Sequence, residues 1–240
     1  MTAVGIFLAA VAAGTVQAVT GFGAGIILMM VVPQFFDMLH APALSSAITI
    51  GISAALAWRF RQQIDITRQI LPIVLYLTTS TAAITVAGSV NLDALAVAFG
   101  VFLMLLSLYF LLLAQKFALR DTVVNMAVCA LVSGVFSGLF GVGGPLMAVY
   151  FLAASETKER YVGSLQFFFA VTSGFNLGVR IFHGIYTLAL VPLTILGMLG
   201  INAGKLLGLK LLDRMNIELM KKLVYGYVGL SGMITILNHF

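Results

Sequence analysis

Apolar residues run through most of the chain in long stretches, separated by short segments that carry the charged residues. An α-helix needs about 20 apolar residues to cross a bilayer. The pattern predicts runs near residues 2–36, 41–58, 69–88, 92–114, 122–154, 161–182, 187–209 and 217–238. The first and fifth runs are too long for one crossing, because straight helices of that length would reach roughly 50 Å across a hydrocarbon core of about 30 Å.

Each over-long run is interrupted by a glycine-rich segment. The first contains Thr20-Gly21-Phe22-Gly23-Ala24-Gly25, and the fifth contains Phe140-Gly141-Val142-Gly143-Gly144-Pro145. Glycine adopts positive φ without penalty, so such a segment allows a sharp turn between two helices. We therefore expect each over-long run to enter the membrane and return as a re-entrant hairpin.

The two breaks lie 120 residues apart, and other structure-breaking residues recur at the same spacing. Gly14, Gly21, Gly23, Pro72 and Gly88 meet Gly134, Gly141, Gly143, Pro192 and Gly208, and Arg59 meets Arg180 at an offset of 121. If both over-long runs return, each half crosses an odd number of times, so the halves have opposite orientations. The sequence predicts an all-α polytopic membrane protein with two inverted repeats, residues 1–120 and 121–240. Each repeat is a glycine-broken re-entrant helical hairpin plus three transmembrane helices.

The charged loops agree with this topology. Basic residues gather at 59–68, 116–120 and 210–222, and basic loops face the cytoplasm. All three fall on one side only if the first and fifth runs are hairpins. The turn at 180–186, with Arg180 and His183, is the one exception. We expect a multi-pass protein of the bacterial inner membrane.

The composition excludes several classes of function. With 61% hydrophobic residues, 9% charged residues and a mean hydropathy of +1.11, the chain is not a soluble globule. A single cysteine excludes a disulfide framework. The histidines and carboxylates lie at the ends of the runs, so we expect no enzyme, no metal-cation transporter and no carboxylate ion site. We also expect no cofactor and no nucleic-acid partner.

The glycine breaks are the candidate binding site. A helix that starts after a break presents unpaired amides and the positive end of its dipole, which attract an anion. The candidate substrate-binding residues are Gln17, Thr20, Gly21, Phe22, Gly23, Ser137, Gly141, Val142, Gly143, Gly144, Gln166 and Asn176. Arg59 and Arg180 are candidates for a gate or vestibule. For the polar side chains, hydrogen bonding between helices is the alternative, and for the arginines it is snorkelling to the interface.

The strings Val19-Thr20-Gly21-Phe22-Gly23 and Ser137-Gly138-Leu139-Phe140-Gly141-Val142-Gly143-Gly144, the duplication and the basic loops resemble the sulfite exporter TauE/SafE family of bacterial membrane permeases. The resemblance implies export of sulfite or of organosulfonates such as sulfoacetate, with the glycine motifs of both halves at the site. The expected partners are a small anionic substrate and the lipid bilayer.

Other anion pathways stay open at this stage. A channel-like conduit, or an importer of thiosulfate, sulfate or a carboxylate, fits the same motifs, and so does a homo-oligomer. An anion that leaves a cell with a negative interior gains about 2.3 kcal/mol per charge per 100 mV, which favours outward flow.

Overall fold

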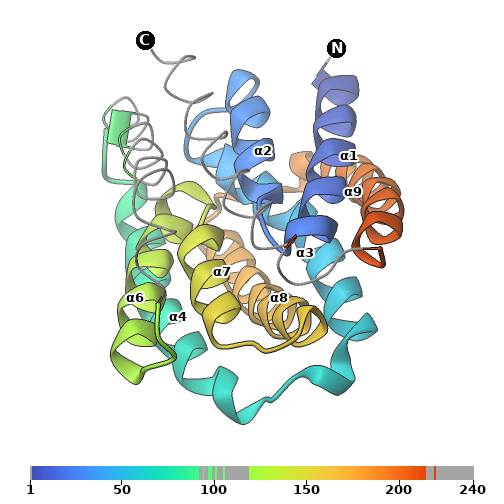
Figure 1. The fold of residues 1–240 in the computed structure, drawn as a ribbon. Helices are drawn as coiled ribbons and strands as arrows, with labels where there is room; N and C mark the ends of the chain where they lie inside the picture. The colour runs from blue at the N-terminus through green and yellow to red at the C-terminus, as the bar shows by residue number, and fades with distance from the viewer. Residues whose placement is uncertain are drawn as a thin grey trace.

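The computed structural model describes residues 2–91 and 119–214, together with isolated positions at 94, 97, 98, 101, 105 and 219. The runs predicted near 92–114 and 217–238 lie otherwise outside the described residues. The helices are α1 (Thr2–Thr20), α2 (Ala24–Val31), α3 (His40–Arg59), α4 (Thr67–Ala87), α6 (Val123–Phe140), α7 (Gly144–Ala153), α8 (Lys158–Phe182) and α9 (Val191–Leu212), with 3-10 turns at Val32–Gln34, Arg61–Gln63 and Leu188–Leu190. The expected all-helical architecture is confirmed for this part of the chain (Figure 1).

The described helices have the length and surface of membrane spans. Six are long and apolar enough to cross a bilayer: α1, α3, α4, α6, α8, and α9 with its preceding turn. Their outward side chains are largely apolar, and exposed examples are Val4, Leu8, Val74, Val128, Leu199 and Leu206. A surface of this kind is suited to lipid rather than to water. The protein is a multi-pass membrane protein.

Both over-long runs break at their glycines. Gly21 and Gly23 have φ of 85° and 100°, and Gly141 has φ of 68° and ends α6 in a left-handed conformation. The arms on the two sides of each break are unequal, however. α1 has 19 residues, or about 28 Å, whereas α2 has 8 residues and α7 has 10. The first arm is therefore nearly as long as a full span, and the helical conformation continues through Gly14 until the positive φ at Gly21.

The helix pairs cross between the two halves of the chain. α1 packs along α9, and α6 packs along α4, while α3 and α8 pack against each other at the centre (Figure 1). Glycines allow close contact at both outer pairs. A Cβ at Gly204 would meet the carbonyl oxygen of Val11, and one at Gly134 would meet the carbonyl oxygen of Tyr76. α1 and α6 thus each pack closely on a helix from the other half of the chain.

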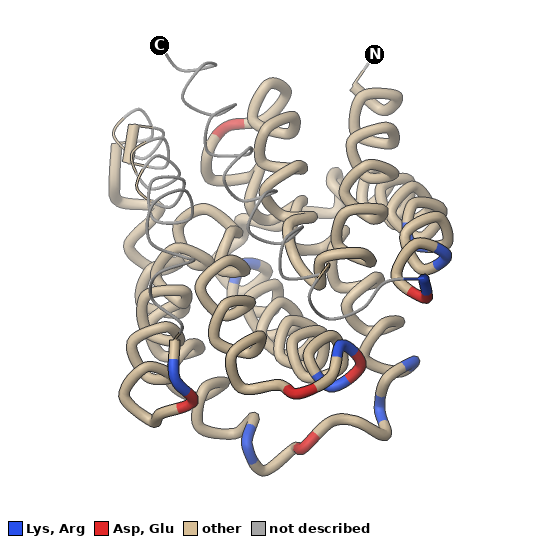
Figure 2. The backbone as a smooth tube through the Cα atoms, viewed as in Figure 1, with Lys and Arg blue, Asp and Glu red and all other residues tan. Residues whose placement is uncertain are grey.

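The charged residues gather in the lower part of the molecule. Figure 2 shows them on the loop that joins α3 to α4, on the loop that joins α7 to α8, and at the start of α6. The N-terminal end of α1 lies at the opposite, upper end. The positive-inside rule assigns the lower end to the cytoplasm. α1 starts at the upper end and α6 at the lower end, so these two helices run in opposite directions.

Candidate functional site

The two glycine breaks contact each other inside the protein. A Cβ built on Gly25 would lie 3.0 Å from the carbonyl oxygen of Gly141, and one built on Gly144 would lie 3.5 Å from Phe22. Residues about 120 positions apart in the sequence therefore form one centre. A side chain at position 25 would make a tighter contact than most Cβ atoms do, so the carbonyl of Gly141 would have to move by a few tenths of an ångström.

A small cavity of about 50 Å³ lies at this centre. A buried water needs roughly 10–15 Å³, so the cavity has room for a few waters or for one small ion. The lining residues are Gln17, Gly23, Gly25, Ile26, Ser46, Thr49, Ser53, Tyr76, Ser137, Gly141, Val142, Gly143, Gly144, Pro145, Phe169 and Ser173. Its polar groups are hydroxyls, amides and backbone, and the lining contains no carboxylate.

Two side chains of α8 bind the carbonyl groups at the end of α1. The Tyr161 hydroxyl donates to the carbonyl oxygen of Thr20 at 2.7 Å, and Nε2 of Gln166 donates to that of Gly21 at 2.6 Å. Oε1 of Gln166 in turn accepts a hydrogen bond from Nε2 of Gln17 at 3.0 Å. The negative end of the α1 dipole is therefore covered by donors from the protein.

At the carboxyl end of α6, α8 supplies a positively charged side chain, Arg180. Nη2 of Arg180 donates to the carbonyl oxygens of Ser137 at 3.1 Å and Gly138 at 2.8 Å, and Nη1 donates to the hydroxyl of Ser46 at 3.3 Å. Nδ2 of Asn176 donates to the Ser137 hydroxyl at 3.3 Å. Side chains of α8 thus donate hydrogen bonds at the carboxyl ends of both α1 and α6.

Arg180 is buried without an acidic partner in the described part of the chain. It is 2% exposed, and the buried polar residues there include no Asp or Glu. A buried charge is costly unless opposite charge or dipoles compensate for it. Carbonyl groups supply part of that compensation, and two of the residues that bind Arg180, Ser46 and Ser137, also line the cavity. Arg180 therefore lies one residue behind the cavity lining.

The amino ends of α2 and α7 also face the cavity. The first amides of a helix have no partner within the helix, and neither end has a side-chain cap. Gly25 and Ile26 of α2 and Gly144 of α7 line the cavity. Because Pro145 has no N–H, it suits the first turn of α7. The described lining of the cavity thus contains two positive helix ends and no carboxylate, and the Arg180 guanidinium lies behind Ser46 and Ser137.

The predicted residues fall into two sets. Seven line the cavity: Gln17, Gly23, Ser137, Gly141, Val142, Gly143 and Gly144. Five form the surrounding support: Thr20, Gly21, Phe22, Gln166 and Asn176. Phe22 is fully buried in the apolar core, and the Thr20 hydroxyl donates to the Phe22 carbonyl at 2.8 Å.

The two arginines that the sequence placed in equivalent positions have different surroundings. Arg59 is on the surface, and its Nη2 lies 3.0 Å from Oδ1 of Asp213. Arg180 lies in the last turn of α8, but it is buried because its guanidinium packs against Ser46 of α3 and Ser137 of α6. The offset of 121 therefore does not predict a common environment.

Sequence reasoning missed two tyrosines. Tyr76 lines the cavity, and Tyr161 binds the end of α1. A buried tyrosine usually has a partner for its hydroxyl, so a tyrosine within an apolar run was the available signal. The sequence alone could not show which helix end each hydroxyl reaches.

Comparison with known proteins gives one match. A family model described as "Sulfite exporter TauE/SafE" matches residues 6–234. No match was found among curated proteins or among solved structures.

Proposed function

The chain belongs to the sulfite exporter TauE/SafE family, and from that premise we propose that it exports sulfite or an organosulfonate such as sulfoacetate across the bacterial inner membrane. The family implies a multi-pass membrane transporter of sulfur-containing anions and not an enzyme. The substrate sits between the two glycine breaks, near the middle of the membrane.

One observation carries the proposal. Side chains of α8 donate hydrogen bonds to the carbonyl oxygens at the carboxyl ends of α1 and α6, whereas the amino ends of α2 and α7 line the cavity. Broken helices in transporters bind anions at amino ends and cations at carbonyl ends. Since the carbonyls of Gly21 and Gly138 already accept hydrogen bonds from the protein, they are poor ligands for Na⁺. The site is therefore selective for negative charge.

Transport proceeds by alternating access between two inverted repeats, residues 1–120 and 121–240. The packing of α1 on α9 and of α6 on α4 supports this, because each pair joins a hairpin to a scaffold helix of the other half. Movement of one repeat against the other shifts both hairpins around a fixed central site. The membrane potential drives the anion outward at about 2.3 kcal/mol per charge per 100 mV.

A ligand screen tests the proposal. Sulfite, sulfoacetate, taurine, thiosulfate, sulfate and simple carboxylates are added to the purified protein, and the melting temperature is measured. Sulfite or sulfoacetate is expected to raise it, because a ligand that binds only the folded state stabilises that state. Arg180→Gln should lose the shift, and the control variant Arg59→Gln should retain it. Stabilisation by Na⁺ and by none of the anions contradicts the proposal.

A further inference from the structure

The partners of the Gln17 side-chain amide fix its orientation. The carbonyl oxygen of Gly21 can only accept, so the atom of Gln166 that lies 2.6 Å from it is the Nε2 donor. Oε1 of Gln166 then faces Gln17, and it accepts from Nε2 of Gln17 at 3.0 Å. The same Nε2 also donates to the Ser53 hydroxyl oxygen, 3.0 Å away. Both N–H donors of the Gln17 amide are therefore used within the protein.

The acceptor of the same amide is free. Gln17 is 3% exposed and lines the central cavity, yet no described residue donates to its Oε1. Among the described residues, the unpaired side-chain atoms without exposed surface are Oγ of Ser45, Oε1 of Gln69 and Oγ of Ser133, so Oε1 of Gln17 retains exposed surface. Buried polar groups are normally paired, so a free carbonyl oxygen on a cavity indicates a ligand that has a hydrogen-bond donor.

A free donor belongs to the residue that Gln17 bonds. Oγ of Ser53 accepts from Gln17 and has no other hydrogen bond in the described chain, so its O–H remains available. Ser53 is 1% exposed and lines the same cavity. A ligand that satisfies both groups must accept one hydrogen bond and donate another. An S–OH group beside a second oxygen on the same sulfur has this pattern.

The rest of the lining favours a compact ligand with a negative charge. The amino ends of α2 and α7 face the cavity, and the Arg180 guanidinium lies behind Ser46 and Ser137. The volume of about 50 Å³ leaves room for a few waters. A small anion that also has a donor is a protonated oxyanion. Sulfite becomes such an ion near neutral pH, where it takes up one proton to give hydrogensulfite.

The described lining has no carboxylate or histidine that could hold this proton in place of the ligand. Its one ionisable side chain is Tyr76 of α4, and α2 and α3 contribute none. Of the other helices that contact α1, α8 carries Tyr161, which donates to Thr20, and α9 carries Lys205, which donates to Asn202. The proton therefore belongs to the ligand.

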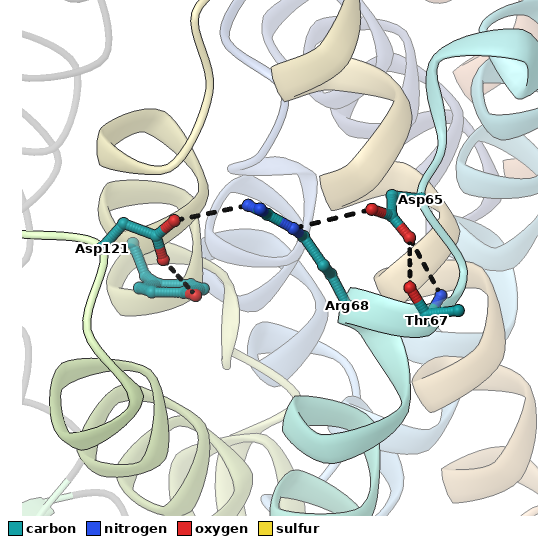
Figure 3. A network of polar contacts seen from close by, with 5 residues as sticks. Asp65, Thr67, Arg68 and Asp121 are labelled. Carbon is teal, nitrogen blue, oxygen red and sulfur yellow. Dashed lines mark hydrogen bonds and ion pairs between the residues drawn. The ribbon is translucent and has the colours of Figure 1, made fainter.

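Carboxylates gather instead at the charged end of the molecule. Figure 3 shows Asp65 and Asp121 on the two sides of Arg68, whose Nε lies 3.6 Å from Asp65 and whose Nη1 lies 3.5 Å from Asp121. The other oxygen of Asp121 accepts a hydrogen bond from the Tyr150 hydroxyl at 2.9 Å. None of these four residues lines the central cavity. Asp121 is thus a titratable group outside the site, and its replacement is a control for effects of pH.

We propose that the central cavity binds sulfite as hydrogensulfite with its proton on oxygen. The S–OH group donates to Oε1 of Gln17, and a second oxygen accepts from the Ser53 hydroxyl. The proposal rests on the proposed function and extends it, because one negative charge and not two then moves in each cycle. Gln17 and Ser53 select the protonated ion, whereas the helix ends select the negative charge. At constant total sulfite, transport should therefore decrease as the pH rises.

The equilibrium distribution of sulfite across a membrane measures the charge that moves. Wild-type protein is reconstituted in proteoliposomes with the same buffered pH on both sides, and a potassium gradient with valinomycin sets a potential of 100 mV, positive inside. Radiolabelled sulfite should accumulate about 50-fold, since one charge moves, whereas movement of two charges would give about 2,500-fold. The larger ratio overturns the proposal and leaves transport of sulfite intact. Absence of sulfite flux overturns the proposed function as well.

A pH series of sulfite binding tests the role of Gln17. In the wild type, the affinity for total sulfite should be about tenfold lower at pH 8 than at pH 6, because the protonated fraction falls by about that factor. Gln17→Met removes the acceptor, so binding should weaken and lose most of this pH dependence. Gln34→Met is the matched control, since Gln34 is exposed and lies outside the cavity lining, and it should retain the pH dependence, as should Asp121→Asn. If Gln17→Met keeps the wild-type pH dependence, or if Asp121→Asn loses it, the proposal fails.

Two competitors identify the donor on the ligand. Methanesulfonate has the charge of hydrogensulfite but no donor, so it should displace sulfite at least about tenfold less well than unlabelled sulfite does. Equal potency would contradict a hydrogen bond to Gln17. Taurine carries an ammonium donor, so if taurine displaces sulfite at a lower concentration than sulfite itself, the free oxygen of Gln17 binds an amine and the proposal fails.

Discussion

Arg180 donates a 2.8 Å hydrogen bond to the carbonyl oxygen of Gly138, which places a buried cation at the carboxyl end of α6. A helix end of this kind carries a partial negative charge. Without Arg180 that end would favour a cation in the central cavity. With Arg180 present, the amino ends of α2 and α7 determine the sign of the ligand. In the proposed function, the pairing of Arg180 with Gly138 therefore makes the central cavity favour an anion.

Replacement of Arg180 tests this role. Arg180→Gln removes the charge and leaves the carbonyls of Ser137 and Gly138 with fewer donors, so we expect sulfite transport to fall at least about tenfold. Arg180→Lys keeps the charge but has fewer donors, so it should retain part of the activity. Flux into proteoliposomes measures both.

The control for this experiment is Arg59→Gln. Arg59 forms an exposed pair with Asp213, and such pairs contribute about 0–1 kcal/mol. Its transport should match the wild type. An equal loss of transport in Arg59→Gln and Arg180→Gln would show that any loss of positive charge impairs the protein. Arg180 would then have no special role.

The glycines of the second break differ in their tolerance of a side chain. A Cβ at Gly143 would meet the Tyr76 hydroxyl and would lie 2.7 Å from the carbonyl oxygen of Ser133, whereas at Gly144 the nearest atom is 3.5 Å away. We expect Gly143→Ala to abolish transport and to lower the melting temperature, since overpacking costs about 1–3 kcal/mol. Gly144→Ala should fold with a melting temperature close to that of the wild type. Similar behaviour of the two variants in flux and melting assays would contradict this close packing.

Much of this site follows from the sequence, for local reasons. Glycine is the residue that adopts positive φ, so the breaks at Gly21, Gly23 and Gly141 could be predicted. Charged residues are costly in lipid, so the loops could be predicted as well. The hydrogen bonds that α8 donates to the carboxyl ends of α1 and α6 could not be predicted. Tyr161 lies 141 residues from Thr20 in the sequence, and Arg180 lies 42 residues from Gly138. Contacts of that range depend on how α8 packs between the halves.

The amide of Gln166 connects the two halves inside the apolar core. Its Nε2 donates to the Gly21 carbonyl, and its Oε1 accepts from Gln17. Gln166→Leu removes both bonds and leaves the Gly21 carbonyl without this donor, while Nε2 of Gln17 keeps its bond to Ser53, so we expect a loss of about 1–3 kcal/mol in stability. Thermal unfolding measures it. Asn202→Leu is the control, because Asn202 is only partly buried and bonds within its own helix. A melting temperature equal to that of the control would contradict the supporting role of Gln166.

The start of α3 predicts a pH dependence of stability. Burial raises the pKa of the Asp37 carboxyl, but the amide and ring of His40 and the amide of Leu39 bond to it and hold that pKa below its usual value. A lowered pKa adds stability above the unfolded value of about 3.9, and this is lost as the pH falls through the folded value. Asp37→Ala should therefore destabilise the protein by about 1 kcal/mol at pH 7 and by clearly less at pH 3. Unfolding experiments at the two pH values measure the difference, and an equal difference at both would contradict the expectation.

The central claim is that the cavity between the glycine breaks carries a sulfur anion through the membrane without Na⁺. Its most direct test is radiolabelled sulfite flux in proteoliposomes that hold the wild type or Arg180→Gln, with Na⁺ or with choline as the only external cation. We expect a saturable flux that is equal in the two cations, is lowered by Arg180→Gln and increases with a potential that draws anions out. A flux that requires Na⁺, or that is the same in Arg180→Gln, would contradict it.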